Sequence, residues 1–219
     1  GNVVVPNPSL QPEYTHTHEI SARYKKEHIK LEGGAFVTFY RDAIVVRDFQ
    51  FNGQDSILYS GRLSQVQANV NAQEAILMGG YLSLNLQWDH FQLLQTLNYT
   101  YGDVIDPFHN IPLDHIPPLF GRGVLSYMQS KWKGSLEWIF NGNKSLDRYS
   151  PRDKGNLSFA TAEGSPGWVI FNFRSSFYTG EKGEWQAGVE NILDSHYRPY
   201  ASRISAPGRN FYASFKYHF

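Results

Sequence analysis

Hydrophobic and polar residues alternate along most of this chain, and the last ten residues show the pattern most clearly. Phe211, Phe215 and Phe219 fall on one side of an extended strand, together with the other odd-numbered residues of that stretch. Asn210 and Lys216 fall on the opposite side, because successive side chains of a strand point to opposite faces. Helical periodicity is almost absent elsewhere, so the sequence predicts an all-β protein.

The alternating segments are about ten residues long, the length that a tilted strand needs to cross the hydrocarbon layer of a membrane. We count about nine of them by their period-two pattern. The third segment is longer than one crossing requires. The segments are Thr17–Lys26, Ile29–Tyr40, Val66–Gln87, His90–Tyr101, Gly121–Lys131, Gly134–Asn141, Trp168–Thr179, Glu184–Leu193 and Asn210–Phe219.

The connections between these segments alternate in length. Short turns occupy residues 26–28, 87–90, 130–133 and 180–183. Long connections span Arg41–Gly61, Asp103–Phe120, Asp147–Gly167 and His196–Arg209. This alternation is typical of an antiparallel up-and-down transmembrane β-barrel, which has tight turns at one rim and extended loops at the other. Counting back from the C-terminus places every long connection at the opposite rim.

Composition narrows the function classes further. The chain has 20 Lys and Arg and 20 Asp and Glu, so it lacks the basic field that nucleic-acid binding requires. Aromatic residues make up 16%, and Trp88, Trp132, Trp168 and Trp185 lie near predicted strand ends, as in an interfacial girdle. The absence of Cys excludes disulfides and thiolate metal sites. No apolar run of about 18 residues is present, which excludes a spanning helix.

Three sequence landmarks resemble those of TonB-dependent outer-membrane receptors. The stretch Gly188–Asp194, followed by Tyr197-Arg198 and then Ala206–Phe211, is similar to the C-terminal end of that family, including a last strand that ends on an aromatic residue. Residues Asn7–Glu13 resemble its N-P-x-L-x-P-E lead-in to a mid-barrel strand. Ile116-Pro117-Pro118, which precedes the fifth segment, resembles another of its landmarks.

The resemblance implies a barrel of about 22 strands with a plugged lumen. It implies a Gram-negative outer-membrane receptor that takes up a scarce nutrient, such as a metal chelate, cobalamin or a glycan. The implied partners are the lipid bilayer, the remaining strands and plug of the same receptor, the small-molecule substrate, and an inner-membrane energy-coupling complex reached through the N-terminal part. We therefore expect residues 1–219 to be the C-terminal portion of the barrel, without the plug and earlier strands.

The number of strands and their unpaired edges favour the same interpretation. Bacterial single-chain barrels have even strand numbers, whereas we count an odd number here. An open sheet in a bilayer would leave the backbone groups of both edge strands unpaired, at a cost of several kcal/mol for each group. We expect the segment to need the rest of its chain.

The sequence predicts no catalytic, cofactor-binding or metal-ligating residue and no cofactor. His16 and His18 share a strand face, as metal ligands would, and His109 and His115 lie in one long loop, but ordinary rim and loop positions explain all four better. Asn191 and Asp194 are expected to begin a turn, and Pro207-Gly208 to shape the return of the loop. The carboxylates considered for acid–base chemistry fit better as lumen or rim residues: Glu19, Glu32, Glu74, Glu137 and Glu190.

Two other function classes stay open at this point. One is a soluble all-β carbohydrate-binding module, whose aromatic faces would pack between two sheets. The other is an outer-membrane barrel enzyme, which the absence of a legible nucleophile–base pairing disfavours. The direction in which the apolar stripes point separates the first of these from the receptor hypothesis.

Overall fold

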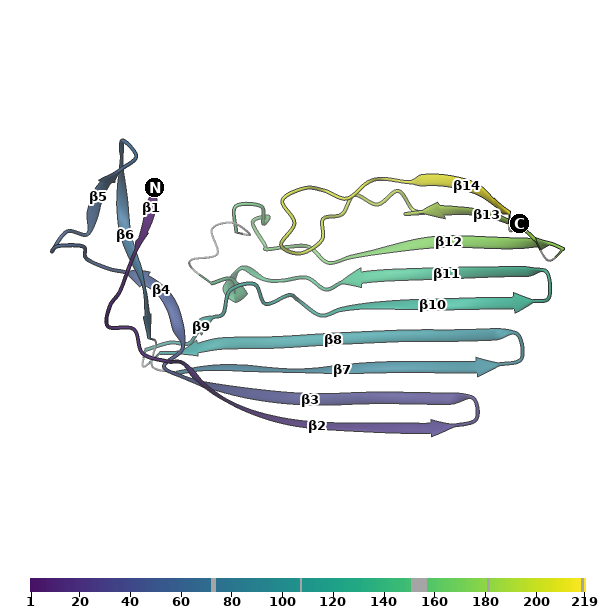
Figure 1. Ribbon diagram of the computed structural model, residues 1–219, viewed down its shortest axis with the longest axis horizontal. Helices are drawn as coiled ribbons and strands as arrows, with labels where there is room; N and C mark the ends of the chain where they lie inside the picture. The colour runs from purple at the N-terminus through teal and green to yellow at the C-terminus, as the bar shows by residue number, and fades with distance from the viewer. Residues whose placement is uncertain (72–73, 107, 151–156, 181, 218) are drawn as a thin grey trace. The chain divides into compact units, whose positions relative to one another are not determined.

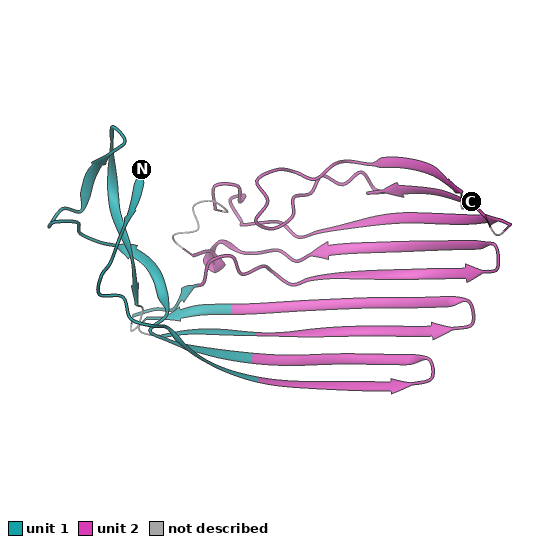
Figure 2. Cartoon of the chain, in the orientation of Figure 1, with its two compact units in different colours: residues 1–18, 37–78, 102–112 teal, residues 19–36, 79–101, 113–219 magenta. Residues whose placement is uncertain are grey.

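The computed structural model consists almost entirely of strands and loops (Figure 1), as the alternation predicts. The structure describes residues 1–71, 74–106, 108–150, 157–180, 182–217 and 219. The chain forms two compact units, which Figure 2 shows in different colours. Unit 1 comprises residues 1–18, 37–78 and 102–112, and unit 2 comprises residues 19–36, 79–101 and 113–219. Within the described chain, no helix is long and apolar enough to span a membrane.

A large sheet contains nine strands in an unbroken order, β14-β13-β12-β11-β10-β8-β7-β3-β2, with the short β9 paired to β8. The pairs from β8 to β14 are antiparallel. The strands are β2 (Tyr14–Lys26), β3 (Ile29–Arg41), β7 (Glu74–Trp88), β8 (Phe91–Ile105), β9 (Ile111–Pro112), β10 (Phe120–Gln129), β11 (Trp132–Asn141), β12 (Trp168–Thr179), β13 (Gly183–Glu190) and β14 (Asn210–Tyr217). Among the described residues, the sheet does not close on itself: β2 and β14 end its path.

The predicted segments correspond to these nine strands with one error. The seventh agrees at both ends with β12, Trp168–Thr179. The third, Val66–Gln87, is wrong as a single segment, because residues before the gap at 72–73 belong to β6 (Arg62–Asn71) in a different sheet and residues after it to β7. Period-two alternation is the same in both sheets, so it could not separate them.

The predicted long connection Arg41–Gly61 is also not simply a loop. It contains β4 (Ile44–Asp48) and β5 (Ser56–Tyr59), which pair antiparallel with β6, while β1 (Asn2–Val5) pairs parallel with it. These strands form a separate sheet in unit 1. Its core comprises Val5, Val66 and Ala68, with Val3, Phe49 and Ile57 packed against them.

The large sheet has an apolar face and a polar face in unit 2. The apolar face carries Phe173 and Phe177, which are 38% and 47% exposed. The polar face carries Glu137 and Asn172, which lie opposite each other across β11 and β12 and are only 6% and 5% exposed. A sheet packed into the core of a soluble protein shows the reverse distribution. The exposed apolar stripes confirm the predicted barrel pattern and disfavour a soluble sandwich.

Indole groups on the apolar face are hydrogen-bonded within the sheet. The Trp138 ring lies over Gly123, where a Cβ would overlap it, and its Nε1 donates to Gln95 Oε1 at 3.0 Å. Trp132 Nε1 donates to Ser175 Oγ at 2.7 Å. These bonds satisfy polar groups that would otherwise face an apolar environment without a partner.

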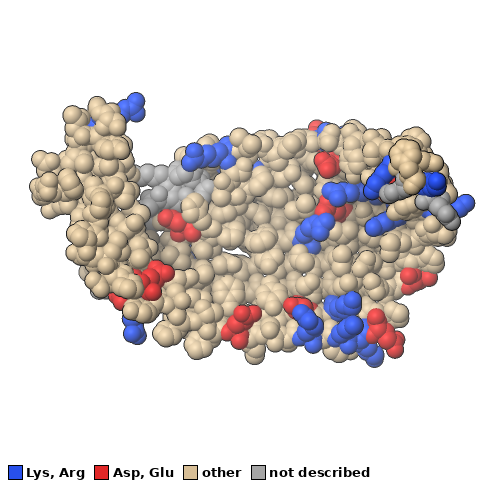
Figure 3. Space-filling model, viewed as in Figure 1, with Lys and Arg blue, Asp and Glu red and all other residues tan. Residues whose placement is uncertain are grey.

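The two ends of the sheet in unit 2 differ. The short turns and the C-terminus lie at one end, and residues 142–150, 157–167 and 191–209 lie at the other (Figure 1). Near the short turns, rings pack in series: the Tyr127 ring lies 4.9 Å from that of Phe91 and 5.4 Å from that of Trp132. On the face that Figure 3 shows, Lys, Arg, Asp and Glu of unit 2 gather mainly toward this end. Aromatic and charged residues therefore mark the short-turn end, whereas Trp168, another of the tryptophans predicted near strand ends, lies at the loop end.

Candidate functional site

A hydrogen-bonded row crosses the polar face of the sheet from β10 to the end of β13. Arg122 Nε donates to Glu137 Oε1 at 2.5 Å, and Asn172 Nδ2 donates to Glu137 Oε2 at 2.9 Å. Arg174 lies 3.6 Å from the same carboxylate. Asn172 Oδ1 then accepts the backbone N–H of Asn191 at 2.8 Å. One buried carboxylate thus joins the strands of the wall to the base of the loop that follows β13.

Asn191 and Asp194 build the turn at the base of that loop. Both have positive φ, 48° and 53°, a conformation that Asn and Asp tolerate better than other non-glycine residues. Asn191 Nδ2 donates to the carbonyl oxygens of Ser195 at 2.9 Å and Pro207 at 3.3 Å. Asp194 Oδ1 accepts the N–H of Arg209 at 2.7 Å. The structural role predicted for Asn191 and Asp194 is confirmed.

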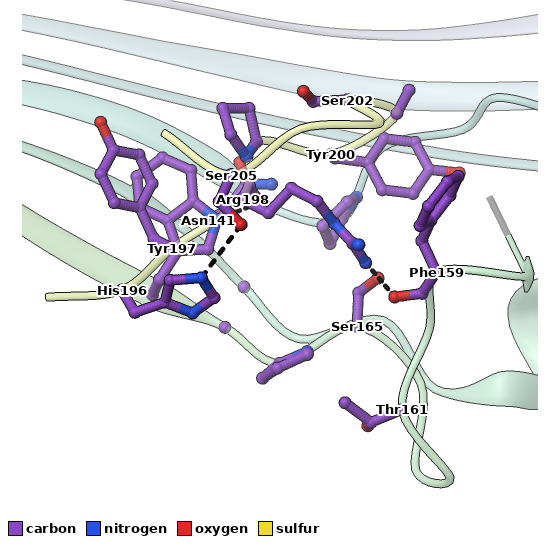
Figure 4. A pocket seen from close by; sticks show the side chains of 17 residues that line it. Asn141, Phe159, Thr161, Ser165, His196, Tyr197, Arg198, Tyr200, Ser202 and Ser205 are labelled. Carbon is purple, nitrogen blue, oxygen red and sulfur yellow. Dashed lines mark hydrogen bonds between the residues drawn. The ribbon is translucent and has the colours of Figure 1, made fainter. Parts of the chain in front are cut away.

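The turn directs residues 195–209 over the loop end of β11 and β12, where a cavity of about 290 Å³ forms (Figure 4). Asn141 and Trp168, which end β11 and begin β12, lie opposite each other on the same face as Glu137 and Asn172, so the cavity opens on the polar face. The lining residues come from three connections: Pro118, Asn141, Gly142, Phe159, Thr161, Ser165, Pro166, Gly167, Trp168, His196, Tyr197, Arg198, Pro199, Tyr200, Ala201, Ser202 and Ser205.

Contacts among the lining residues fix the wall of the cavity. Trp168 Nε1 donates to the Arg198 carbonyl at 3.1 Å, and its ring lies 4.6 Å from that of Tyr197. The Arg198 guanidinium reaches the Phe159 carbonyl and lies 5.1 Å from the Phe159 ring (Figure 4). His196 Nε2 lies 3.0 Å from Ser205 Oγ. Aromatic and arginine contacts therefore hold the loop against its neighbours.

The chemistry of the cavity favours binding. Its described lining combines aromatic rings with hydroxyl groups, one guanidinium and one imidazole. Rings supply flat contact surface, and hydroxyl and guanidinium groups supply directional hydrogen bonds, which is the usual division of labour in a ligand site. Burial raises the pKa of the Tyr197 phenol, and the nearby Glu190 carboxylate raises it further.

Sequence reasoning did not identify this cavity. It predicted the connections Asp147–Gly167 and His196–Arg209 but not that they meet. Two features of the sequence could have indicated the cavity. One is the density of aromatic and arginine residues in Tyr197–Tyr200, and the other is Trp168 at a predicted strand end. Aromatic residues in a loop at a sheet end suggest a binding surface, yet only the tertiary arrangement shows which rings share it.

The histidines considered as metal ligands do not assemble into a site in the part of the chain that the structure describes. His16 and His18 share one face of β2 with Ile20 and Tyr24, which is the predicted apolar face. His109 precedes β9 and His115 follows it, and the two residues belong to different units. No group of three or more His, Cys, Asp or Glu that could hold a metal occurs among the described residues.

Among the described residues, Glu137 and Glu32 are the carboxylates of this set that form ion pairs with arginine. Glu137 is engaged by arginines as described above. Glu32 accepts from Arg23 at 2.8 Å across β2 and β3. A carboxylate neutralised by a guanidinium is poorly suited to exchange protons, so these ion pairs disfavour acid–base chemistry at Glu137 and Glu32.

Comparison with known proteins gives one family. The family model described as TonB dependent receptor-like, beta-barrel, matches residues 1–192. No curated protein matches the chain. The copper transporter OprC is 21% identical with a TM-score of 0.73, and the match covers 97% of this chain and 32% of that one.

Two further solved structures show the same fold. The FrpB iron transporter from Neisseria meningitidis is 12% identical with a TM-score of 0.69, over 99% of this chain and 33% of that one. The siderophore receptor PirA from Acinetobacter baumannii is 16% identical with a TM-score of 0.68, with the same coverage of 99% and 33%. The chain thus spans about a third of the length of these structures, and its large sheet is a segment of a barrel wall of their kind.

Proposed function

Because this chain belongs to the TonB-dependent receptor β-barrel family, a family of Gram-negative outer-membrane proteins, we propose that residues 1–219 form the C-terminal part of the barrel wall of an active nutrient transporter. The single observation that supports this most is one continuous sheet with exposed apolar rings on one face and a hydrogen-bonded polar row, including the buried Glu137 and Asn172, on the other. Lipid would cover the first, and the channel interior would adjoin the second.

The proposal includes partners outside this chain. The earlier strands of the receptor would pair with the edges of β2 and β14, and a plug would fill the interior. An inner-membrane energy-coupling complex would drive transport. The substrate would be a metal chelate, cobalamin or a glycan. We favour a metal or metal chelate, because the solved structures with this fold include a copper transporter, an iron transporter and a siderophore receptor.

The loop cavity would contribute to substrate recognition. It opens on the polar face at the end of the sheet where the long connections lie, which is the extracellular mouth in a barrel of this kind. Its rings and hydrogen-bonding groups would bind a substrate reversibly. This function requires no nucleophile or general base.

The experiment is uptake by the full-length receptor, expressed in a Gram-negative host that lacks its own metal, siderophore and cobalamin receptors. Copper, ferric enterobactin, cobalamin and an oligosaccharide would be supplied separately, each in labelled form. We expect one of them to accumulate only when the energy-coupling complex is present. Equal accumulation without that complex would indicate a passive pore, and accumulation of none of the four would contradict the proposed substrate range.

A further inference from the structure

Lys144 is a buried cation that contacts Tyr200, one of the residues lining the loop cavity. It lies shortly after the end of β11, is 6% exposed and is not among the cavity lining residues. The backbones of Lys144 and Ser165 exchange two hydrogen bonds: each N–H donates to the other residue's carbonyl oxygen at 2.9 Å. Lysine is rarely buried so completely unless its charge is compensated, so the surroundings of its ammonium group need an explanation.

The ammonium group joins three loop segments. Lys144 Nζ donates to the carbonyl oxygen of Ile116 at 2.6 Å and to Tyr200 Oη at 2.7 Å. It also lies 4.9 Å from the centre of the Tyr149 ring and 4.6 Å from that of Tyr200. These contacts combine charge-assisted hydrogen bonds with cation–π attraction. A single side chain thus ties the segment before β10 and the segment after β11 to the loop between β13 and β14.

The contact with Tyr200 matters because that residue faces the cavity. Tyr200 is one of the lining residues, together with its neighbours Pro199 and Ala201. Ala201 has a φ of 62°, which is an unfavourable conformation for alanine and persists only where surrounding contacts hold it. Lys144, which does not line the cavity, contacts Tyr200, while the side chain of Arg198 contacts Phe159, and both of these residues do line it.

We propose that Lys144 is a positioning residue, which holds the Tyr200 segment in place so that the cavity exists before a substrate enters. A preformed site avoids the entropy cost of ordering a loop during binding. The inference rests on the proposed function only in naming the cavity as a substrate site. The local claim, that Lys144 immobilises residues 199–201, stands or falls independently of transport.

Spin labelling tests this claim directly. The 219 residues contain no cysteine, so Ala201→Cys gives one labelling site, once any cysteine elsewhere in the full-length receptor is replaced by serine. In lipid nanodiscs, we expect an immobilised nitroxide spectrum for Ala201→Cys alone. Adding Lys144→Met, which keeps a long unbranched side chain but removes the charge and donors, should give a dominant mobile component. Lys144→Arg should restore much of the immobilised component.

Matched controls separate positioning from general stability. Ser130→Cys places a label in the turn between β10 and β11, and we expect its spectrum not to respond to Lys144→Met. Lys131→Met removes an exposed lysine at that turn and should leave both labels unchanged. Unchanged spectra at Ala201→Cys in the Lys144→Met receptor would overturn the proposal. Equal mobilisation of both labels would also overturn it, because that result indicates loss of the whole fold.

Should Lys144→Met fail to insert, Tyr200→Phe provides the second variant. It keeps the ring that the ammonium contacts and removes only the hydroxyl that accepts the hydrogen bond from Lys144, so we expect a smaller mobile component at Ala201→Cys. No change with Tyr200→Phe would contradict the role of the 2.7 Å hydrogen bond. Because none of these spectra depends on uptake, a receptor that transports nothing but shows the expected mobilisation would refute the function and leave the positioning role intact.

Discussion

Replacing Glu137 by Gln is expected to destabilise the barrel wall. The Glu137 side chain is 8% exposed and accepts hydrogen bonds from Arg122 and Asn172. Glu137→Gln removes the negative charge and replaces one acceptor oxygen by an NH₂ group. That group can only donate, so it must face one of the two donors and leave it without its partner.

The size of the effect follows from the exposure of the partners. A hydrogen bond to a charged group contributes about 1.5–3 kcal/mol, and losing one partner of a buried ion pair costs about 3–5 kcal/mol. The side chains of Arg122 and Arg174 are 55% and 52% exposed, so water can solvate them after the charge is lost. We therefore expect a loss of about 2 kcal/mol, toward the lower end of these ranges.

The assay is urea unfolding of the full-length receptor from phospholipid vesicles, followed by tryptophan fluorescence. Glu19→Gln, a change at an exposed carboxylate in β2, is the matched control and should stay within about 0.5 kcal/mol of the wild type. A double-mutant cycle with Arg122→Gln isolates the pair. A coupling energy near zero, or a Glu137→Gln receptor as stable as the wild type, would refute the reasoning.

Three further predictions concern the apolar face and the loop cavity. Gly123→Ala forces its new methyl group into the Trp138 ring and should cost about 1–3 kcal/mol in the same unfolding assay; an unchanged midpoint would show that the ring moves freely. Arg198→Ala should raise the substrate concentration for half-maximal uptake about tenfold, whereas the exposed Arg203→Ala should not; equal effects would contradict a role for the cavity. The raised pKa of Tyr197 means that the folded loop favours the neutral phenol. The stability that this preference contributes is complete below the ordinary pKa of 10.0, and it is lost as the pH rises through the higher pKa of the folded state. Tyr197→Phe should abolish the corresponding alkaline change in loop proteolysis, and a change that persists in this variant would refute the assignment.

The wall of the barrel could be predicted from sequence because each strand carries its own signal. The segment Trp168–Thr179 was correct at both ends, since aromatic and polar residues alternate from Phe171 to Arg174 and glycine precedes and follows the segment. The C-terminal motif likewise predicted the turn at Asn191 and Asp194, because a turn is local and depends on residue type. Neither inference required knowledge of a distant residue.

The sheet of unit 1 could not be predicted in this way. Strand β6 alternates like a wall strand and runs on toward β7 in sequence, so the pattern joined the two. Its separation depends on pairing with β4 and β5 and with β1, about sixty residues earlier, which offers only the short run Val3–Val5 as a signal. The local pattern of residues specifies that a segment is a strand. Which strand it pairs with depends on contacts between residues far apart in sequence.

The sequence by itself determined that this chain alternates apolar and polar residues at strand length, with connections that differ in length between the two rims, and so predicted a barrel wall. Its C-terminal motif, not the alternation, carried the resemblance to the family. Only the tertiary structure decided which polar side chains meet: the row from Arg122 to Asn191, the cavity beside Trp168, and the buried ammonium of Lys144. The reason is physical. Alternation follows from the different environments of the two faces of a strand, so it can be read from consecutive residues. A cavity exists only where chain segments far apart in sequence come together.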